Sequence, residues 1–358
     1  MKATRTLHDL GQSLWLDNIT RELLTSGTLK RYIDELSVTG LTSNPTIFDH
    51  AIAKSTAYDA EIRALKKTGI PGEDLFFKLA IADLQVAADL FKPIHERTAG
   101  VDGFVSLEVS PLLAYDAGKT VAAAKSLHAA AARPNLFIKI PGTKEGLPAI
   151  EEAIFSGVPI NVTLLFSREH YLAAAHAYMR GLERRFDAGL SLDVRSVASL
   201  FVSRWDKATM ATLPANLRDR LGIAVAGSSY AAYRDLLDSN RWQRLENQGA
   251  RPQRLLFAST GTKDPKASDT LYIGGLAAPN TVNTMPEETL NAFAEHGGVG
   301  DALPRDGGDS AEILAAIGKA GVDTAKLAAD LQAEGAKSFD DSWSDLLKAI
   351  DAKSHALS

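Results

Sequence analysis

Short apolar runs alternate along the chain with longer segments in which apolar residues recur every three or four positions. The first pattern is typical of buried strands, and the second is typical of helices with one buried face. Eight strand-like runs occur, at Leu14–Leu16, Gly40–Thr42, Phe104–Val109, Leu136–Ile140, Pro159–Leu164, Val197–Val202, Leu255–Ala258 and Leu271–Ile273. The intervening pattern predicts helices at Thr28–Leu36, Leu75–Arg97, Tyr115–Ala131, Lys144–Phe155, Ser167–Arg185, Ser203–Met210 and Met285–His296.

This alternation predicts an α/β fold. Strands that are almost continuously apolar belong to a parallel sheet covered by helices on both faces. Eight strand and helix units favour a closed (β/α)8 TIM barrel, and an open doubly wound sheet is the competing arrangement. No low-complexity linker divides residues 1–358, so we expect one domain with residues 309–358 as C-terminal helices packed on the barrel. Those helices are predicted at Ser310–Ala333 and Asp341–Lys353, and loops are predicted at Ala250–Arg254 and Gly297–Asp309.

Composition and charge narrow the range of functions. The chain is 45% hydrophobic and 23% charged, which is ordinary for a globular protein. Its formal net charge of −5 disfavours binding to nucleic acid. No apolar run is long enough to span a membrane, and the first residues do not resemble a secretion signal, so we expect a soluble cytoplasmic protein. The absence of cysteine excludes disulfides, thiolate metal ligands and cysteine nucleophiles.

The most informative polar residue is Lys139, which interrupts the otherwise apolar run Leu136–Ile140. Lysine is almost never fully buried without a partner, and desolvation favours the neutral amine, which can attack a carbonyl carbon. Lys139 is therefore a candidate Schiff-base lysine. The alternative is a strand-end lysine that reaches solvent or pairs with a carboxylate.

Two carboxylates also end strand-like runs, where a barrel places its functional groups. Asp17 follows Leu14–Leu16, and Glu108 lies inside Phe104–Val109. Near an amine they would supply a proton carrier for imine formation and a base for carbon–carbon cleavage. For Asp17 the alternative is a helix N-cap, whereas a strand interior is a poor place for an unpaired Glu108.

Further polar groups follow the later strands. Asn161 and Thr163 are two positions apart, so both side chains face the same side of their strand and could bind hydroxyls or a water. Arg204 follows Val197–Val202, and Ser259–Lys263 is a small-residue loop suited to a phosphate. Ordinary barrel-interior hydrogen bonds, a solvated arginine and a simple turn are the alternatives. The eight histidines form no metal-binding motif.

Taken together, these segments resemble the transaldolase family from about Leu14 to His296. The specific matches are Leu16–Asn18, Gly40–Thr46, Val105–Pro111, Ile138–Thr143, Ile160–Ser167 and Asp269–Tyr272. Trp15, the chain length and Thr281–Pro286 are most similar to the longer transaldolases of actinobacteria and cyanobacteria.

The resemblance implies an enzyme of the non-oxidative pentose phosphate pathway that needs no cofactor and no metal. It would transfer a dihydroxyacetone unit from sedoheptulose 7-phosphate or fructose 6-phosphate to glyceraldehyde 3-phosphate or erythrose 4-phosphate. Its sugar-phosphate substrates would be its partners, with no nucleic acid or membrane, and the chain would be a monomer or homodimer.

The same resemblance implies roles for individual residues. Lys139 would be the Schiff-base lysine, Asp17 the acid and base for cleavage, and Glu108 with Thr163 would position a water. The remaining residues would bind substrate: Asn44 and Asn161 the hydroxyls, and Ser199, Arg204 and Ser259 the phosphate. Shorter family members have Ser-x-Arg where this chain has Ser259–Gly261, and Lys263 is the candidate replacement for that arginine.

Two competing functions remain open from the sequence. A Schiff-base aldolase on the same barrel would release free dihydroxyacetone, but fructose-6-phosphate aldolases resemble one another in having Tyr where this chain has Phe201. A catalytically silent barrel that binds sugar phosphates is the other, although a binding module has no use for an amine between two carboxylates.

Overall fold

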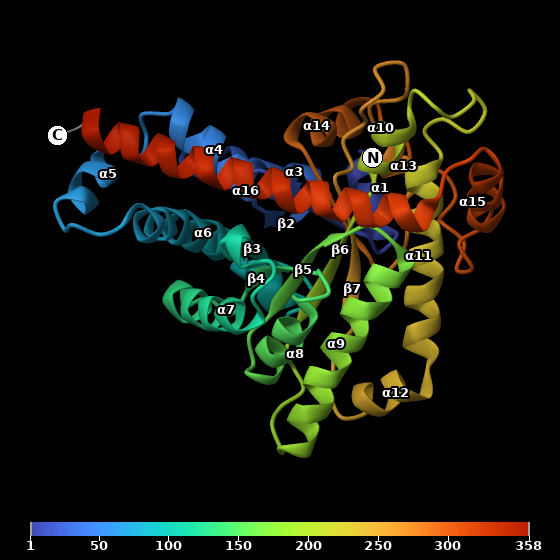
Figure 1. The fold of residues 1–358 in the computed structure, drawn as a ribbon, viewed down its shortest axis with the longest axis horizontal. Coiled ribbons are helices and arrows are strands. Elements are labelled where there is room, and N and C mark those ends of the chain that lie inside the picture. Colours follow the sequence, from blue (N-terminus) through green and yellow to red (C-terminus); the bar gives the residue numbers. More distant parts are fainter. Residues whose placement is uncertain (1, 357–358) are drawn as a thin grey trace.

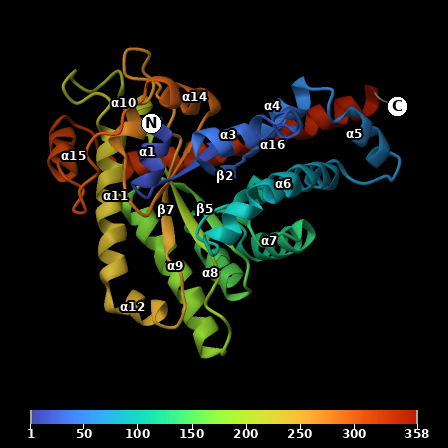
Figure 2. The ribbon, with the colours of Figure 1, turned by 180° about the vertical axis from the view of Figure 1, so that it is seen from behind.

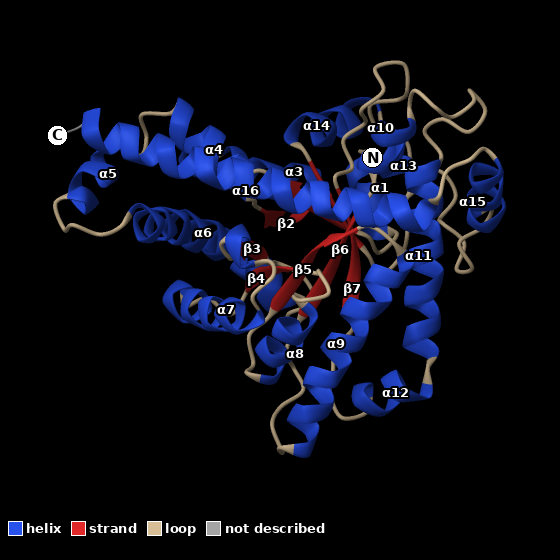
Figure 3. Ribbon diagram, in the orientation of Figure 1, coloured by secondary structure: helices blue, strands red, loops and turns tan. Residues whose placement is uncertain are grey.

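The computed structural model describes residues 2–356, in which eight parallel strands form a closed barrel inside a layer of helices (Figure 1, Figure 3). Each strand pairs with the next one along the chain, and β8 pairs with β1. The strands are β1 Ser13–Asp17, β2 Val38–Thr42, β3 Val105–Glu108, β4 Leu136–Pro141, β5 Ile160–Leu165, β6 Ser196–Phe201, β7 Gln253–Ala258 and β8 Val282–Met285. This topology confirms the (β/α)8 TIM barrel.

Helices connect the strands and extend beyond them at both ends of the chain. From α1 to α8 they are Ala3–Asp9, Arg21–Thr25, Thr28–Leu36, Pro45–Lys54, Asp59–Lys66, Gly72–Arg97, Ala117–Ala131 and Leu147–Phe155, with a 3-10 turn η1 at Pro111–Leu113. From α9 to α16 they are Arg168–Asp187, Ser203–Thr209, Leu221–Asp238, Asn240–Glu246, Leu271–Gly275, Glu287–His296, Ser310–Lys319 and Thr324–Ala356.

One strand prediction is wrong. Leu271–Ile273 forms helix α13, and the eighth strand is β8. Three apolar residues are too few to distinguish the two periodicities. Tyr272 is buried in that helix, where its hydroxyl donates a hydrogen bond to Asp206, 2.8 Å away. β8 was not predicted, because the polar residues Asn283 and Thr284 interrupt its apolar pattern.

The C-terminal helices also differ from the prediction. The expected break between Ala333 and Asp341 is absent, because α16 is continuous from Thr324 to Ala356, and the actual break lies at residues 320–323. The predicted loop Ala250–Arg254 already contains the start of β7, whereas Gly297–Asp309 is confirmed as a loop. The helix α11 was not predicted, since it is buried on several sides and lacks a clear polar face.

Alternate residues of each strand face two different cores. Residues such as Ile138 and Leu255 pack outward against the helices. Trp15, Phe137 and Leu256 belong to a second apolar cluster, which fills the barrel and extends to α16. Side chains on a strand alternate between its two faces, so a residue two positions after an inward-facing residue also faces the barrel axis. In β1 and β4 these are Asp17 and Lys139.

Gly40 is required for the first strand pair to close. It pairs with Trp15 across β1 and β2, beside an irregularity in the register. A Cβ at position 40 would lie 2.5 Å from Nε1 of Trp15. That indole donates a 2.8 Å hydrogen bond to Asp102, so it cannot turn away without losing a buried partner.

The long helix α16 crosses the carboxyl ends of the strands and runs beside α4 (Figure 1, Figure 2). Gln332 donates hydrogen bonds from Nε2 to the backbone oxygens of Gly142 (3.2 Å) and Leu164 (2.9 Å), which follow or end barrel strands. Farther along, Trp343 packs edge-on against Phe76 of α6, with ring centres 5.0 Å apart. The helix therefore forms part of the wall around the carboxyl ends of the strands. Among residues 2–356, no helix is both long enough and apolar enough to cross a membrane.

Candidate active site

A pocket of about 140 Å³ opens at the carboxyl ends of the strands. It gathers side chains from most of the barrel and from α16. Its lining includes nine of the eleven site residues predicted from sequence, namely Asp17, Asn44, Lys139, Thr163, Ser199, Phe201, Arg204, Ser259 and Lys263. The other two, Glu108 and Asn161, hydrogen-bond to residues of this lining.

Lys139 is buried and paired inside the barrel. Its Nζ donates hydrogen bonds to Oε2 of Glu108 and to the backbone oxygen of Ser43, each 2.9 Å away. Strand register explains the pairing, because Glu108 of β3 lies opposite Lys139 of β4. Only 5% of Lys139 and 4% of Glu108 is exposed, so the amine does not extend into bulk solvent. The carboxylate pairing considered from the sequence is present, and it lies at the pocket.

Burial dominates the electrostatics of both carboxylates. It raises the pKa of Glu108, and the positive charge of Lys139 opposes this shift without cancelling it. Burial likewise raises the pKa of Asp17, against the charge of Lys139 and a 2.8 Å hydrogen bond from Thr42. Both acids therefore hold protons more readily than in water. They can exchange protons with nearby groups closer to neutral pH.

Asp17 is not a helix cap. Thr20 caps α2 instead, since its hydroxyl accepts a 3.0 Å hydrogen bond from the backbone nitrogen of Leu23. Asp17 ends β1 beside Thr42 of β2 and lines the pocket. The alternative considered from the sequence is therefore wrong for this residue.

Asn161 and Ser199 form a fixed polar pair on neighbouring strands. Ser199 donates a 2.7 Å hydrogen bond to Oδ1 of Asn161, whose Nδ2 donates to Ser106, 3.1 Å away. Thr163 lies on the same face of β5 as Asn161, as its two-residue spacing predicted. These bonds orient Asn161, and Thr163 lies in the pocket lining.

Two buried oxygens near Lys139 lack hydrogen-bond partners among residues 2–356. They are Oε1 of Glu108 and Oγ1 of Thr163. A buried polar atom without a partner is rare and usually marks a place for a water or ligand. Leu164, next to Thr163, adopts a left-handed backbone (φ +59°) at an irregularity in the pairing of β5 with β6. Strained backbone of this kind is concentrated at functional sites.

Asn44 caps a helix and also lines the pocket. Its Oδ1 accepts a 3.0 Å hydrogen bond from the backbone nitrogen of Ile47 and so caps α4. Its Nδ2 hydrogen-bonds to no other residue in the described part of the chain. The cap thus fixes the side chain while one amide group stays available.

Two cations in the lining, Arg204 and Lys263, have no hydrogen-bond or ion-pair partner anywhere in residues 2–356. The guanidinium of Arg204 lies 5.1 Å from the ring centre of Phe201 and 6.0 Å from that of Phe339. Burial lowers the pKa of Arg204, but a guanidinium stays protonated at neutral pH. Ser259 adopts a left-handed backbone (φ +54°) in the loop that carries Lys263. This side of the pocket is suited to an anion.

The sequence analysis missed several residues of the lining. Thr42 ends β2, Thr284 is the last residue but one of β8, and the two hydroxyls hydrogen-bond to each other at 2.6 Å. The search for polar strand ends would have found Thr42. Phe339 of α16 carried no signal, because an apolar residue on an amphipathic helix is indistinguishable from core. No group of three or more His, Asp or Glu side chains suited to a metal occurs in the described residues.

Comparison with known proteins identifies the family of this chain. The family model described as Transaldolase/Fructose-6-phosphate aldolase matches residues 14–350. A transaldolase of Parafrankia sp. (strain EAN1pec) is 45% identical over 359 residues, covering 97% of each chain. Transaldolases of Thermobifida fusca and Kocuria rhizophila are each 46% identical, covering at least 96% of each chain. The chain therefore belongs to the transaldolase/fructose-6-phosphate aldolase family.

Proposed function

We propose that this protein is a transaldolase that works through a Schiff base on Lys139. It transfers a dihydroxyacetone unit from a ketose phosphate, such as fructose 6-phosphate or sedoheptulose 7-phosphate, to an aldose phosphate. The observation that carries the proposal is the buried pair of Lys139 and Glu108, at 2.9 Å, in a pocket shared with Asp17.

The first step is imine formation at the ketose carbonyl. Lys139 must lose a proton before Nζ can attack, and Glu108 is its direct hydrogen-bond acceptor with a raised pKa. Addition gives a carbinolamine, and expulsion of its hydroxyl as water requires a proton. The unpartnered oxygens of Glu108 and Thr163 would hold the water that delivers that proton.

The second step breaks a carbon–carbon bond. Asp17 takes the proton from the C4 hydroxyl, the C3–C4 bond breaks, and the aldose phosphate leaves. The electron pair remains on C3 and is delocalised into the protonated imine as an enamine. An incoming aldehyde then forms the new bond, and Asp17 returns its proton to the new hydroxyl. Hydrolysis of the imine frees the product and restores Lys139.

The remaining residues hold the substrate. Asn44 and Asn161 bind hydroxyls of the dihydroxyacetone unit, and Ser199 orients Asn161 through their 2.7 Å hydrogen bond. Arg204, Ser259 and Lys263 bind the phosphate. Lys263 takes the place of the arginine found in shorter members of the family, as a point charge instead of a bidentate fork. Among residues 2–356 neither Arg204 nor Lys263 forms an ion pair or a hydrogen bond, so none there is broken when phosphate binds.

The test is to trap the intermediate. The protein is incubated with fructose 6-phosphate, reduced with borohydride, digested and examined by mass spectrometry. A three-carbon adduct on the peptide containing Lys139 is expected. A folded protein that gives no adduct, or an adduct on another lysine, would refute the mechanism.

An Asp17→Asn variant separates the two steps. It retains the amine but lacks the base for cleavage, so reduction should trap a six-carbon adduct on Lys139 in place of the three-carbon one. If the variant gives the three-carbon adduct at the normal rate, another group is the base and the role of Asp17 is wrong.

Phe201 distinguishes transfer from simple aldol cleavage, the other activity in the family's description. Its ring packs against Phe166 with centres 5.2 Å apart and lines the pocket without offering a hydroxyl. Proton delivery to the enamine, which would release free dihydroxyacetone, therefore has no donor at this position. Fructose 6-phosphate alone should release little dihydroxyacetone, and Phe201→Tyr should increase that release. If the unmodified protein releases dihydroxyacetone as fast as it transfers it, the aldolase function is the correct one.

A further inference from the structure

A second and larger pocket, of about 470 Å³, opens at the opposite end of the barrel. Its lining includes residues at the amino ends of strands, among them Ser13 of β1 and Ser196 of β6. The lining continues over Thr98 and Asn280, which lie in connections between elements. Ligand pockets commonly have volumes of about 300–1,000 Å³, so this one can hold a small metabolite. The pocket at the carboxyl ends, which contains Lys139, shares none of these residues.

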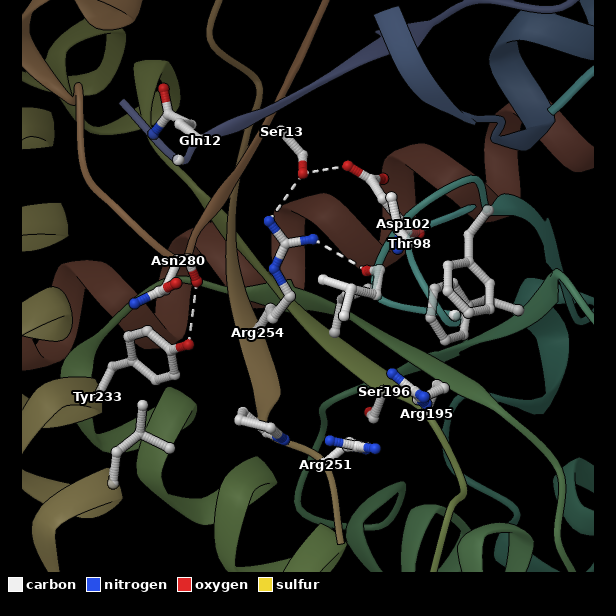
Figure 4. Close-up of a pocket in the computed structure, with 18 of the residues that line it drawn as sticks. Gln12, Ser13, Thr98, Asp102, Arg195, Ser196, Tyr233, Arg251, Arg254 and Asn280 are labelled. Carbon is white, nitrogen blue, oxygen red and sulfur yellow. Dashed lines mark hydrogen bonds between the residues drawn. The ribbon is translucent and has the colours of Figure 1, made fainter. Parts of the chain in front are cut away.

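Three arginines line this second pocket: Arg195, Arg251 and Arg254 (Figure 4). The chain as a whole is acidic, with a net charge of −5, so this concentration of positive charge is local. The pocket has two carboxylates, Asp102 and Glu246. Arg195 also pairs with Asp193, so three carboxylates balance the three arginines, and the attraction of an anion depends on guanidinium donors that have no partner among residues 2–356.

Asp102 is hydrogen-bonded on both oxygens by its own surroundings. One of its oxygens accepts a hydrogen bond from Nε1 of Trp15 at 2.8 Å and another from the backbone nitrogen of Gly103 at 3.0 Å. Its other oxygen accepts a hydrogen bond from Ser13. Ser13 in turn accepts a 2.8 Å hydrogen bond from Arg254. Asp102 is only 5% exposed, and its oxygens are turned to these protein donors.

The arginines differ in how far the protein satisfies them. Arg254 donates hydrogen bonds to Ser13 and to the backbone oxygens of Val101 and Thr281, and is therefore part of the wall. Arg195 pairs with Asp193, but its Nη1 has no partner in the described residues. Arg251 has no side-chain hydrogen bond or ion pair with any of residues 2–356. Two guanidinium groups thus have free donors at one pocket.

The rest of the lining combines apolar side chains with polar ones such as Gln12 and Ser196. Phe104 and Phe137 stack with ring centres 4.1 Å apart, and Leu237 and Pro252 lie on other parts of the lining. Apolar walls with a few fixed polar groups are typical of sites for small organic ligands. A guanidinium can bind a phosphate through two parallel hydrogen bonds.

We propose that this pocket binds a small organic phosphate monoester, with its phosphate on Arg251 and Arg195 and its carbon skeleton against the apolar lining. The site is separate from the proposed catalytic function and would stand if that function were wrong.

Titration calorimetry with phenyl phosphate tests the proposal. An Arg204→Gln background removes a phosphate-binding group from the carboxyl-end pocket, so that binding there does not obscure the result. In that background, phenyl phosphate should still bind with a stoichiometry of one. Arg251→Gln should weaken this binding at least tenfold, because a charged bidentate contact is lost. Glu246→Gln should strengthen it, because a negative charge is removed from the lining.

Arg97→Gln is the matched control. Arg97 is exposed in the last turn of α6, next to Thr98 of the lining, and its replacement removes the same charge without touching the pocket. Its binding should change less than twofold. If the Arg97 and Arg251 variants lost equal amounts of affinity for phenyl phosphate, the loss would come from the overall charge of the protein, and the proposal would be overturned.

Further results would also contradict the site. Loss of all binding in the Arg204→Gln background, when the protein is folded by circular dichroism, would place phenyl phosphate in the other pocket. Equal affinity for inorganic phosphate and phenyl phosphate would overturn the assignment to an organic ester. Arg251 is exposed, and its side chain has no hydrogen bond or ion pair with residues 2–356, so its replacement should leave the thermal midpoint unchanged and the binding result interpretable.

Discussion

The surroundings of the Lys139 amine are defined by the residues that touch it. Lys139 donates a 2.9 Å hydrogen bond to Glu108, in surroundings that disfavour charge on the carboxylate. An isolated buried ion pair is a weak source of stability, because desolvation offsets the attraction between the charges. In the proposed mechanism the pair acts instead as a proton donor and a proton acceptor.

Asp17 should set the acidic limb of the pH profile. Its carboxylate must be ionised to act as a base, and burial raises its pKa, so activity should fall as the pH drops through a value above the ordinary aspartate pKa of about 3.9. Measuring kcat/KM against pH checks this. Asp17→Asn should lower kcat by roughly 10²- to 10⁴-fold and remove that limb. Normal turnover in the variant would exclude Asp17 as the base.

The sequence predicted these residues because each breaks a local rule. A lysine and a glutamate inside apolar strands stand out against their neighbours, and so do Asn161 and Thr163 on one strand face. Phe339 breaks no such rule. The sequence also gives no sign that the Arg251 side chain lacks a hydrogen-bond or ion-pair partner among residues 2–356. Their importance depends on which elements meet in space, and the hydrophobic pattern carries no information about that.

At the scale of elements, a single strand can supply both a side chain that packs inside the barrel and a side chain that lines the pocket. In β4, Phe137 belongs to the apolar filling of the barrel, and Lys139, two residues later, lines the pocket. A shift of one residue in register would turn both side chains outward. Packing of the barrel interior is therefore coupled directly to the position of the amine.

Gly40→Ala tests this coupling. The new Cβ would lie 2.5 Å from Nε1 of Trp15, and displacing the ring would break its hydrogen bond to Asp102. Overpacking of this kind costs about 1–3 kcal/mol in the free energy of unfolding, measurable by urea denaturation. Gly318→Ala in α15 is the control, since its Cβ would meet no atom within 4 Å and should be neutral or stabilising. Equal effects would contradict the packing argument.

The helix α16 should influence substrate affinity through Phe339. Its ring centre lies 6.0 Å from both Nζ of Lys139 and Cζ of Arg204. Phe339→Leu keeps an apolar side chain but removes the ring face that stabilises the guanidinium, so KM for the phosphorylated substrates should rise about threefold to tenfold with less change in kcat. Leu327→Ala, on the same helix but outside the pocket, should leave KM unchanged. An unchanged KM in the Phe339 variant would limit α16 to a structural role.

For the molecule as a whole, the fold was predictable because the alternation of elements repeats eight times. Errors at single elements, such as Leu271–Ile273, do not alter that repeat. The C-terminal segment is not part of the repeating strand and helix pattern, so the continuity of α16 and its path over the pocket could not be inferred. The positions of the two pockets at opposite ends follow from the closed barrel and from no local pattern.

The site should lower the stability of the whole protein. Lys139→Met alone leaves Glu108 as an unpaired buried carboxyl, which should cost about 3–5 kcal/mol at neutral pH. The loss should be smaller in acid, because a protonated Glu108 carries no charge. Replacing both, with Lys139→Met and Glu108→Leu, should restore or exceed the original stability while abolishing carbon transfer. Denaturation at two pH values measures this, and a double variant weaker than the single one would contradict it.

The path of α16 also has a consequence for how the enzyme is made. All eight strands precede α16 in the chain, so they leave the ribosome before the helix that carries Phe339 and Gln332. Folding during synthesis begins with the segments that emerge first. A nascent barrel can therefore hold Lys139 at an incomplete pocket, reachable by any aldehyde in the surroundings, until the arrival of α16 completes the wall.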